Sequence, residues 1–74
     1  MIPLLQLAPG TDATVSAIRA DSALCLRLAA MGFRIGQRVL MVRKGAFAGP
    51  LHVRLGTTDV IVRRSQAGQI DVVR

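Results

Sequence analysis

Few residues of this 74-residue chain are able to carry out chemistry: it has one Cys, one His, four Asp and no Glu. Cys25 and His52 are the one pair that could act as a nucleophile and its general base. Cys25, however, lies among leucines in an expected helix, where a Cys usually behaves as a small hydrophobic residue. We therefore expect no catalytic dyad and interpret the chain as a non-enzyme.

Metal binding is limited by the same scarcity. A stable site for Fe²⁺ or Zn²⁺ needs three or four His, Cys or carboxylate ligands. His52 and Asp59 are expected on one face of a β-hairpin, so they are weak candidates for a two-ligand surface site, which a second molecule would have to complete. We expect no metal site within the chain and no required cofactor, with at most weak binding of a divalent metal at such a surface or intermolecular site.

The composition excludes several classes of protein. Apolar residues make up 51% of the chain, which is too many for a disordered basic tail. The longest strongly apolar run, Val39–Val42, is far too short to cross a membrane, and the first residues do not resemble a secretory signal. We expect a cytoplasmic protein.

The basic residues raise the question of a nucleic-acid partner, because Lys and Arg outnumber Asp and Glu by 10 to 4. They are dispersed along the chain, and Phe33 and Phe47 are the only aromatic residues that could stack on bases. We therefore expect no nucleic-acid partner. Attraction to an anionic membrane surface stays open as an alternative use of the charge.

The elements that position these residues are mostly short strands. Period-2 alternation predicts a hairpin over residues 51–63 with Gly56-Thr57 as its two-residue turn, which places Arg54 opposite Asp59. A helix of about ten residues is expected to start after a cap at Asp21 or Ser22 and to end at Gly32. The other expected elements are an extended arm (1–7), a turn (9–12), strands (13–19, 38–43 and 69–73), a loop (45–50) and a one-turn connector (66–68). About five strands and one short inserted helix make a mainly β fold, a small closed or half-closed barrel formed as a single domain over residues 1–74.

The order and spacing of several motifs resemble the pattern of a known family over almost the whole chain. The helix end, Arg27-Leu28-x-x-Met31-Gly32-Phe33, is the most specific part of the pattern. The remaining parts are Leu7-x-x-Gly10-x-x-Ala13-x-Val15-x-x-Ile18, Gly36-x-x-Val39-x-Met41, Gly49-Pro50-x-x-Val53-x-Leu55-Gly56, Val60-x-Val62-Arg63 and Ala67-x-x-Ile70-x-Val72. The ordered set resembles the FeoA family of ferrous iron transport proteins.

The resemblance implies an SH3-like barrel and a cytoplasmic role beside FeoB, the membrane transporter of ferrous iron, whose cytosolic part includes a G-protein domain. It implies a non-enzymatic regulator that reaches the membrane through this partner and forms at most a weak homo-oligomer. FeoA-like domains also occur at the ends of iron-dependent repressors. The alternative is therefore a small basic nucleic-acid-binding or repressor-accessory domain.

A partner surface is the best use of the apolar residues that the barrel does not need. Alternation along the strands places Leu40, Val42 and Ile61 on the outer face of the barrel. The chain's own helix or arm could cover Leu40 and Val42. Phe47 lies at the tip of a Gly-flanked loop, and exposed aromatic residues often carry much of the energy of an interface. Arg27 either binds a carboxylate of the partner or braces its own barrel.

Overall fold

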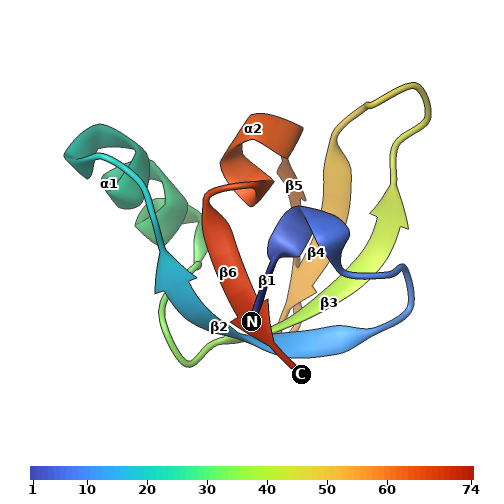
Figure 1. The fold of residues 1–74 in the computed structure, drawn as a ribbon, viewed down its shortest axis with the longest axis horizontal. Helices are drawn as coiled ribbons and strands as arrows, with labels where there is room; N and C mark the ends of the chain where they lie inside the picture. Colours follow the sequence, from blue (N-terminus) through green and yellow to red (C-terminus); the bar gives the residue numbers. More distant parts are fainter.

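A computed structural model describes all residues, 1–74, and shows a mainly β protein with two short α-helices (Figure 1). Its six strands form one antiparallel sheet in the order β1-β6-β2-β3-β4-β5. The strands are β1 (Ile2–Pro3), β2 (Asp12–Ile18), β3 (Arg38–Lys44), β4 (Leu51–Leu55), β5 (Thr58–Val62) and β6 (Ile70–Val73). The helices are the 3₁₀ helix η1 (Leu4–Gln6), α1 (Ser22–Met31) and α2 (Arg64–Ala67).

The β4–β5 hairpin has the predicted register. Val53 lies opposite Val60, and Arg54 lies opposite Asp59. Because successive side chains of a strand point to opposite faces, Val53 and Val62 are fully buried while Arg54 and Ile61 are exposed. The alternation of the sequence therefore determines which side chains of this hairpin are left for a surface site.

The sheet curls because β2 pairs with two strands along its length. Its first half pairs with β3 and its second half with β6, and a bulge interrupts the register between Val15 and Ala17. A second bulge, between Met41 and Arg43, bends β3 against β4. Bulges increase the local twist and bend of a strand, which allows so short a sheet to wrap around its core. The fold is the expected SH3-like barrel.

The N-terminal arm and α2 add to the expected elements. The arm is not simply extended: Ile2 and Pro3 pair with β6 as a sixth strand, and Leu4–Gln6 turn into η1. The one-turn connector is a four-residue helix, α2, which contacts η1. Leu4 and Ala67 are fully buried, so both segments help to close the core, and Figure 1 shows them beside each other.

Helix α1 has the caps that its sequence predicts. The side chain of Asp21 accepts a 2.8 Å hydrogen bond from the backbone N–H of Leu24, so Asp21, and not Ser22, is the N-cap. Gly32 ends the helix at φ +106°, in the left-handed region, and the N–H of Phe33 returns to the carbonyl of Leu28. Phe33 and Leu28 are both buried, which fixes α1 on the barrel by one face and leaves the rest of the helix exposed.

Candidate functional site

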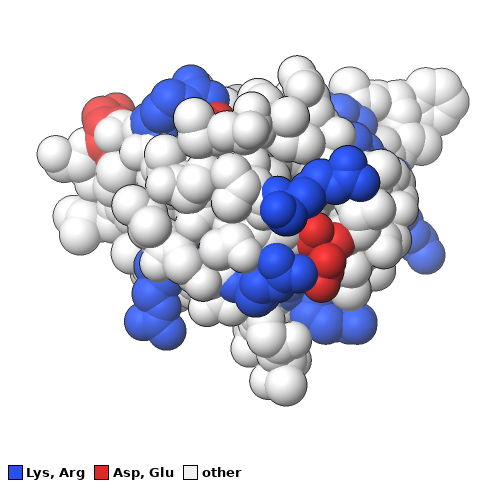
Figure 2. Space-filling view, turned by 60° about the horizontal axis from the view of Figure 1, so that its bottom comes forward, with Lys and Arg blue, Asp and Glu red and all other residues white.

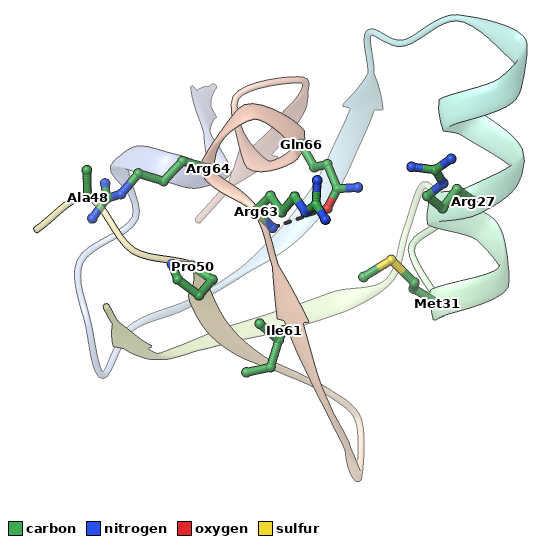
Figure 3. A pocket seen from close by; sticks show the side chains of 8 residues that line it. All are labelled: Arg27, Met31, Ala48, Pro50, Ile61, Arg63, Arg64 and Gln66. Atoms are coloured by element: carbon green, nitrogen blue, oxygen red, sulfur yellow. Dashed lines mark hydrogen bonds between the residues drawn. The ribbon is translucent and has the colours of Figure 1, made fainter. Parts of the chain in front are cut away.

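A hollow of about 600 Å³ lies between α1 and the end of the barrel formed by β5 and α2 (Figure 3). We call it the basic groove. Four parts of the chain contribute to it: α1, the loop before β4, β5 and α2 with the residue before it. The residues that line it are Arg27, Met31, Ala48, Pro50, Ile61, Arg63, Arg64 and Gln66.

The wall on α1 consists of Arg27 and Met31, which are four residues apart and therefore share one side of the helix. Leu28 is fully buried next to Arg27, so the helix cannot rotate without exposing this anchor. Arg27 is exposed and makes no ion pair or side-chain hydrogen bond within the protein. Its guanidinium contacts no carboxylate of the chain and is free toward the groove (Figure 3).

The opposite wall follows from the alternation along β5 and the turn into α2. Ile61 and Arg63 flank the buried Val62 and so lie on the outer face. The backbone N–H of Arg63 donates a 3.1 Å hydrogen bond to Oε1 of Gln66, which fixes this corner at the start of α2. The apolar side chain of Ile61 thus lies beside a charged residue that the turn holds in place.

Arg64 joins α2 to the loop before β4. Its Nη2 group donates a 3.4 Å hydrogen bond to the carbonyl oxygen of Gly45, while its Nε atom is buried without a partner. A buried N–H group without an acceptor is unfavourable, so the fold holds this side chain at some cost in stability. This is the one guanidinium of the groove that the fold itself partly holds.

The four carboxylates of the protein are all used elsewhere. Asp21 caps α1, and the other three form ion pairs: Asp12 with Arg38, Asp59 with Arg54, and Asp71 with Arg19. Figure 2 shows one face, where the acidic atoms lie beside basic side chains and other basic groups stand apart. The guanidinium groups of the groove have no internal counter-charge, and the net charge of +6 is partly concentrated there.

The loop between β3 and β4 presents Phe47 next to Ala48 of the groove. Both residues have positive φ angles, +54° and +60°, which non-glycine residues seldom adopt. The loop is closed by a hydrogen bond from the N–H of Gly45 to the carbonyl of Pro50, at 2.9 Å. A Cβ atom at Gly45 would lie only 2.7 Å from that oxygen, so the loop base requires glycine. The side chain of Phe47 is fully exposed.

The structure separates the five residues predicted for partner binding. Arg27 and Ile61 lie in the basic groove, and Phe47 lies at the tip of the loop that contributes Ala48. Leu40 is half-buried in a different hollow, where its cross-strand neighbours are Asp12 and Arg54. Val42 is half-buried beside the bulge of β3.

Most of the residues that line the groove are not among those predicted for partner binding. Met31 is half-buried and packs against the core as well as lining the groove, and Arg63 and Arg64 belong to the basic residues that the sequence disperses along the chain. The adjacent Arg63-Arg64 pair was an available signal, because two arginines at a strand end are unlikely to both find a carboxylate in a chain with four acids. The contribution of the loop at Ala48 and Pro50 had no signal in the sequence.

His52, Arg54 and Asp59 form a cluster on the outer face of the β4–β5 hairpin. Arg54 donates to both oxygens of Asp59, at 2.6 and 3.3 Å. Nε2 of His52 lies 3.0 Å from Oδ2 of Asp59, although its N–H does not point along this line as in a regular hydrogen bond. The hydrogen bonds from Arg54, together with the contact to His52, lower the pKa of Asp59 to about 2. The predicted neighbourhood of His52 and Asp59 is therefore present, with Arg54 in the same cluster.

Within one copy of the chain, His52 and Asp59 offer two ligands to a metal ion. No group of three or more His, Cys, Asp and Glu side chains is gathered anywhere in the protein. In the hairpin cluster, Asp59 is already bound by the cation Arg54, which a metal ion would have to displace. Cys25 is remote from this chemistry, since its thiol donates to the carbonyl oxygen of Ala20 in the first turn of α1.

The strand order, the caps and the groove together define a small SH3-like barrel protein with a basic surface hollow. Its sequence matches the family model described as the FeoA domain over residues 2–74, and the chain belongs to the FeoA family. This family is linked to ferrous iron transport. No curated protein matches the chain, and no helix in it is long and apolar enough to cross a membrane.

Solved structures of FeoA proteins share the fold. The FeoA of Stenotrophomonas maltophilia, solved with zinc and described as a prokaryotic SH3 domain protein, is 34% identical, with a TM-score of 0.82, over 97% of this chain and 89% of that one. An iron uptake regulatory protein (FeoA) gives a TM-score of 0.91 at 22% identity, over 97% of this chain and 95% of that one. A manganese-dependent transcriptional repressor gives 0.88 at 26% identity, where this chain covers 40% of the repressor.

Proposed function

We propose that this chain is a non-enzymatic cytoplasmic adaptor that binds the cytosolic part of a ferrous iron transporter of the FeoB type and regulates it. The observation that carries the proposal is the FeoA match over residues 2–74. In this proposal the chain acts as one domain, needs no cofactor, and reaches the membrane only through the transporter. Iron is then the cargo of the partner and not a ligand of this chain.

The proposed mechanism is differential binding. An adaptor can shift the transporter between two states only if it binds one of them more tightly. The surface that supports this role combines the exposed Phe47, Ile61 of the basic groove and the unpaired Arg27. Aromatic and Arg side chains are enriched among the residues that carry interface energy.

The second candidate is an accessory domain of a metal-dependent repressor, which the likeness to the manganese-dependent repressor supports. In that case the partner would be a DNA-binding domain. The two candidates differ in the partner that the same surface would bind.

The test is a binding titration between this chain and the soluble cytosolic domain of the transporter, without nucleotide, with GDP and with a non-hydrolysable GTP analogue. We expect saturable binding that is tighter in one nucleotide state. The rate of GTP hydrolysis is recorded in the same samples. No binding in any state would refute the adaptor role.

Two variants make the titration specific. Phe47→Ala removes a side chain that the fold does not use, so we expect weaker binding by a protein of unchanged stability. Leu26→Ala is the matched control, because Leu26 is also largely exposed but lines none of the three hollows. Binding of duplex DNA at physiological salt, with no binding of the transporter domain, would favour the repressor-accessory role.

A further inference from the structure

The basic groove has the chemistry of a site for an acidic peptide. We propose that it binds an extended acidic segment of the partner, with an aliphatic side chain of that segment on Met31 and Ile61 and its carboxylates on Arg27 and Arg63. This deepens the proposed function and rests on it, since the segment is assigned to the same partner. The occupant is defined here by its chemistry, an Asp- and Glu-rich peptide that carries one or more Leu or Ile residues.

Charge complementarity is the first argument. The groove brings Arg27, Arg63 and Arg64 around one hollow, and none of its lining residues is acidic. The nearest carboxylate along β5 is Asp59, on the same strand face as Ile61, and its charge is compensated by Arg54. A guanidinium binds a carboxylate through two parallel N–H groups, so free arginines favour carboxylate-bearing partners.

The other two hollows of the protein provide the contrast. One contains Asp21 together with Arg19, and the other contains Asp12 together with Arg38 and Arg54. Each of them therefore holds its own counter-charge. The basic groove is the hollow that lacks one.

The apolar residues and the concave shape of the groove favour a peptide, and not a flat membrane surface, as its occupant. Met31, Pro50 and Ile61 lie on one side of the hollow, below the three arginines in the view of Figure 3, and the hollow of about 600 Å³ has room for one or two side chains. Arg64 lies at the end next to the loop, where its guanidinium adds positive charge to the lining of the hollow. A bilayer is flat and would reach the guanidinium groups without filling the apolar floor.

The experiment uses the full chain and a short fluorescein-labelled peptide that alternates Glu with Leu, followed by fluorescence anisotropy. We expect saturable binding that weakens as salt is raised. Two further probes separate the contributions: one with Gln in place of every Glu, and one with Ser in place of every Leu. Both are expected to bind more weakly than the original peptide, and equal binding of either would overturn the proposal.

The matched variants change two arginines at a time. Arg27→Gln with Arg63→Gln removes two exposed charges of the groove, and we expect the affinity to fall by about tenfold, the combined effect of two exposed ion pairs. Arg34→Gln with Arg43→Gln removes two exposed, unpaired charges outside the groove and is expected to change the affinity less than twofold. An equal loss in both pairs would mean general electrostatic attraction and would overturn the groove as a site.

Vesicles of phosphatidylcholine and phosphatidylglycerol form the last arm. Stronger binding to these vesicles than to the peptide, lost in the groove variant alone, would replace the peptide by a membrane surface and overturn the proposal. The transporter titration then distinguishes two failures. If the groove variant binds the transporter domain like the unchanged protein, this inference fails while the adaptor role stands; if the transporter domain never binds but the peptide does, the adaptor role fails alone.

Discussion

The guanidinium of Arg19 binds both carboxylate oxygens of Asp71, across 52 residues of sequence. Its Nε donates to Oδ2 at 2.8 Å and its Nη2 to Oδ1 at 3.0 Å, and Nη2 also donates to the carbonyl oxygen of Gly68. Asp71 is the one charged residue that is buried, with 6% of its surface exposed. The pair therefore ties the end of β2 to β6 and to the turn after α2, where the barrel closes. The hydrogen bonds from Arg19 lower the pKa of Asp71 below its usual value.

Stability should fall in acid because of Asp71 and Asp59. Both carboxyls have a lower pKa in the folded protein, about 2 for Asp59, than the value of 3.8 that an unperturbed Asp has. The folded state then binds fewer protons than the unfolded state between these values, so the contribution is complete above pH about 4 and is lost as the pH falls to about 2. Urea unfolding across this range is the measurement. A flat free energy of unfolding would contradict it.

Substitution of each Asp by Asn shows how much each carboxylate contributes to the loss of stability in acid. Asp59→Asn and Asp71→Asn should each be less stable than the unchanged protein at neutral pH, with a difference that shrinks toward pH about 2. Asp71→Asn should have the larger effect, because the Asp71 side chain is buried whereas that of Asp59 is partly exposed. Asp12→Asn is the control, because the Asp12–Arg38 pair is largely exposed and surface pairs contribute little.

The contribution of the α1 N-cap to stability can be tested by removing the carboxylate of Asp21. Asp21→Ala removes the acceptor for the N–H of Leu24 and should lower the free energy of unfolding by about 1 kcal/mol. For a domain of this size that corresponds to a melting temperature lower by about 4–8 °C, measured by circular dichroism. Asp21→Asn should keep most of the stability, and Ser22→Ala should have little effect because Ser22 is inside the helix.

Phe47 should serve function at the expense of stability. Its φ of +54° is unfavourable for a residue other than Gly, Asn or Asp, so Phe47→Asn should raise the free energy of unfolding by about 1 kcal/mol while weakening partner binding. Phe33→Ala gives the contrast: this side chain is buried, and its loss should cost about 3–5 kcal/mol. A less stable Phe47→Asn protein would mean that Phe47 packs on its own fold.

Zinc should bind weakly to the monomer. His52 and Asp59 are two ligands at most, and Arg54 already occupies the carboxylate. Calorimetric titration should show no saturable binding at low protein concentration, and binding that appears at high concentration should depend on a second copy. His52→Ala should abolish that concentration-dependent binding. Tight binding of one zinc by the monomer, retained in His52→Ala, would place a site elsewhere.

Local chemistry explains why much of the fold could be predicted. The Gly56-Thr57 turn connects the two strands of the β4–β5 hairpin and fixes their register. The pairing of Arg54 with Asp59 was therefore predicted from spacing alone. The caps at Asp21 and Gly32 act within one helical turn, so the sequence predicted Gly32 and narrowed the N-cap to Asp21 or Ser22. The arm was harder, because its pairing with β6 depends on a strand at the other end of the chain.

The sequence by itself determined the period of each strand, the ends of α1 to within a residue, the small number of residues able to act as catalysts or metal ligands, and the motif spacing of the FeoA family. Only the tertiary structure decided which charges stay free. Arg19 and Asp71 meet because β2 and β6 are neighbours in the sheet, and this pair leaves the groove without a carboxylate. The groove itself exists because the curled sheet brings α1, a loop, β5 and α2 around one hollow. Turns and caps depend on neighbours within a few residues, whereas the position of a guanidinium depends on how the whole barrel closes.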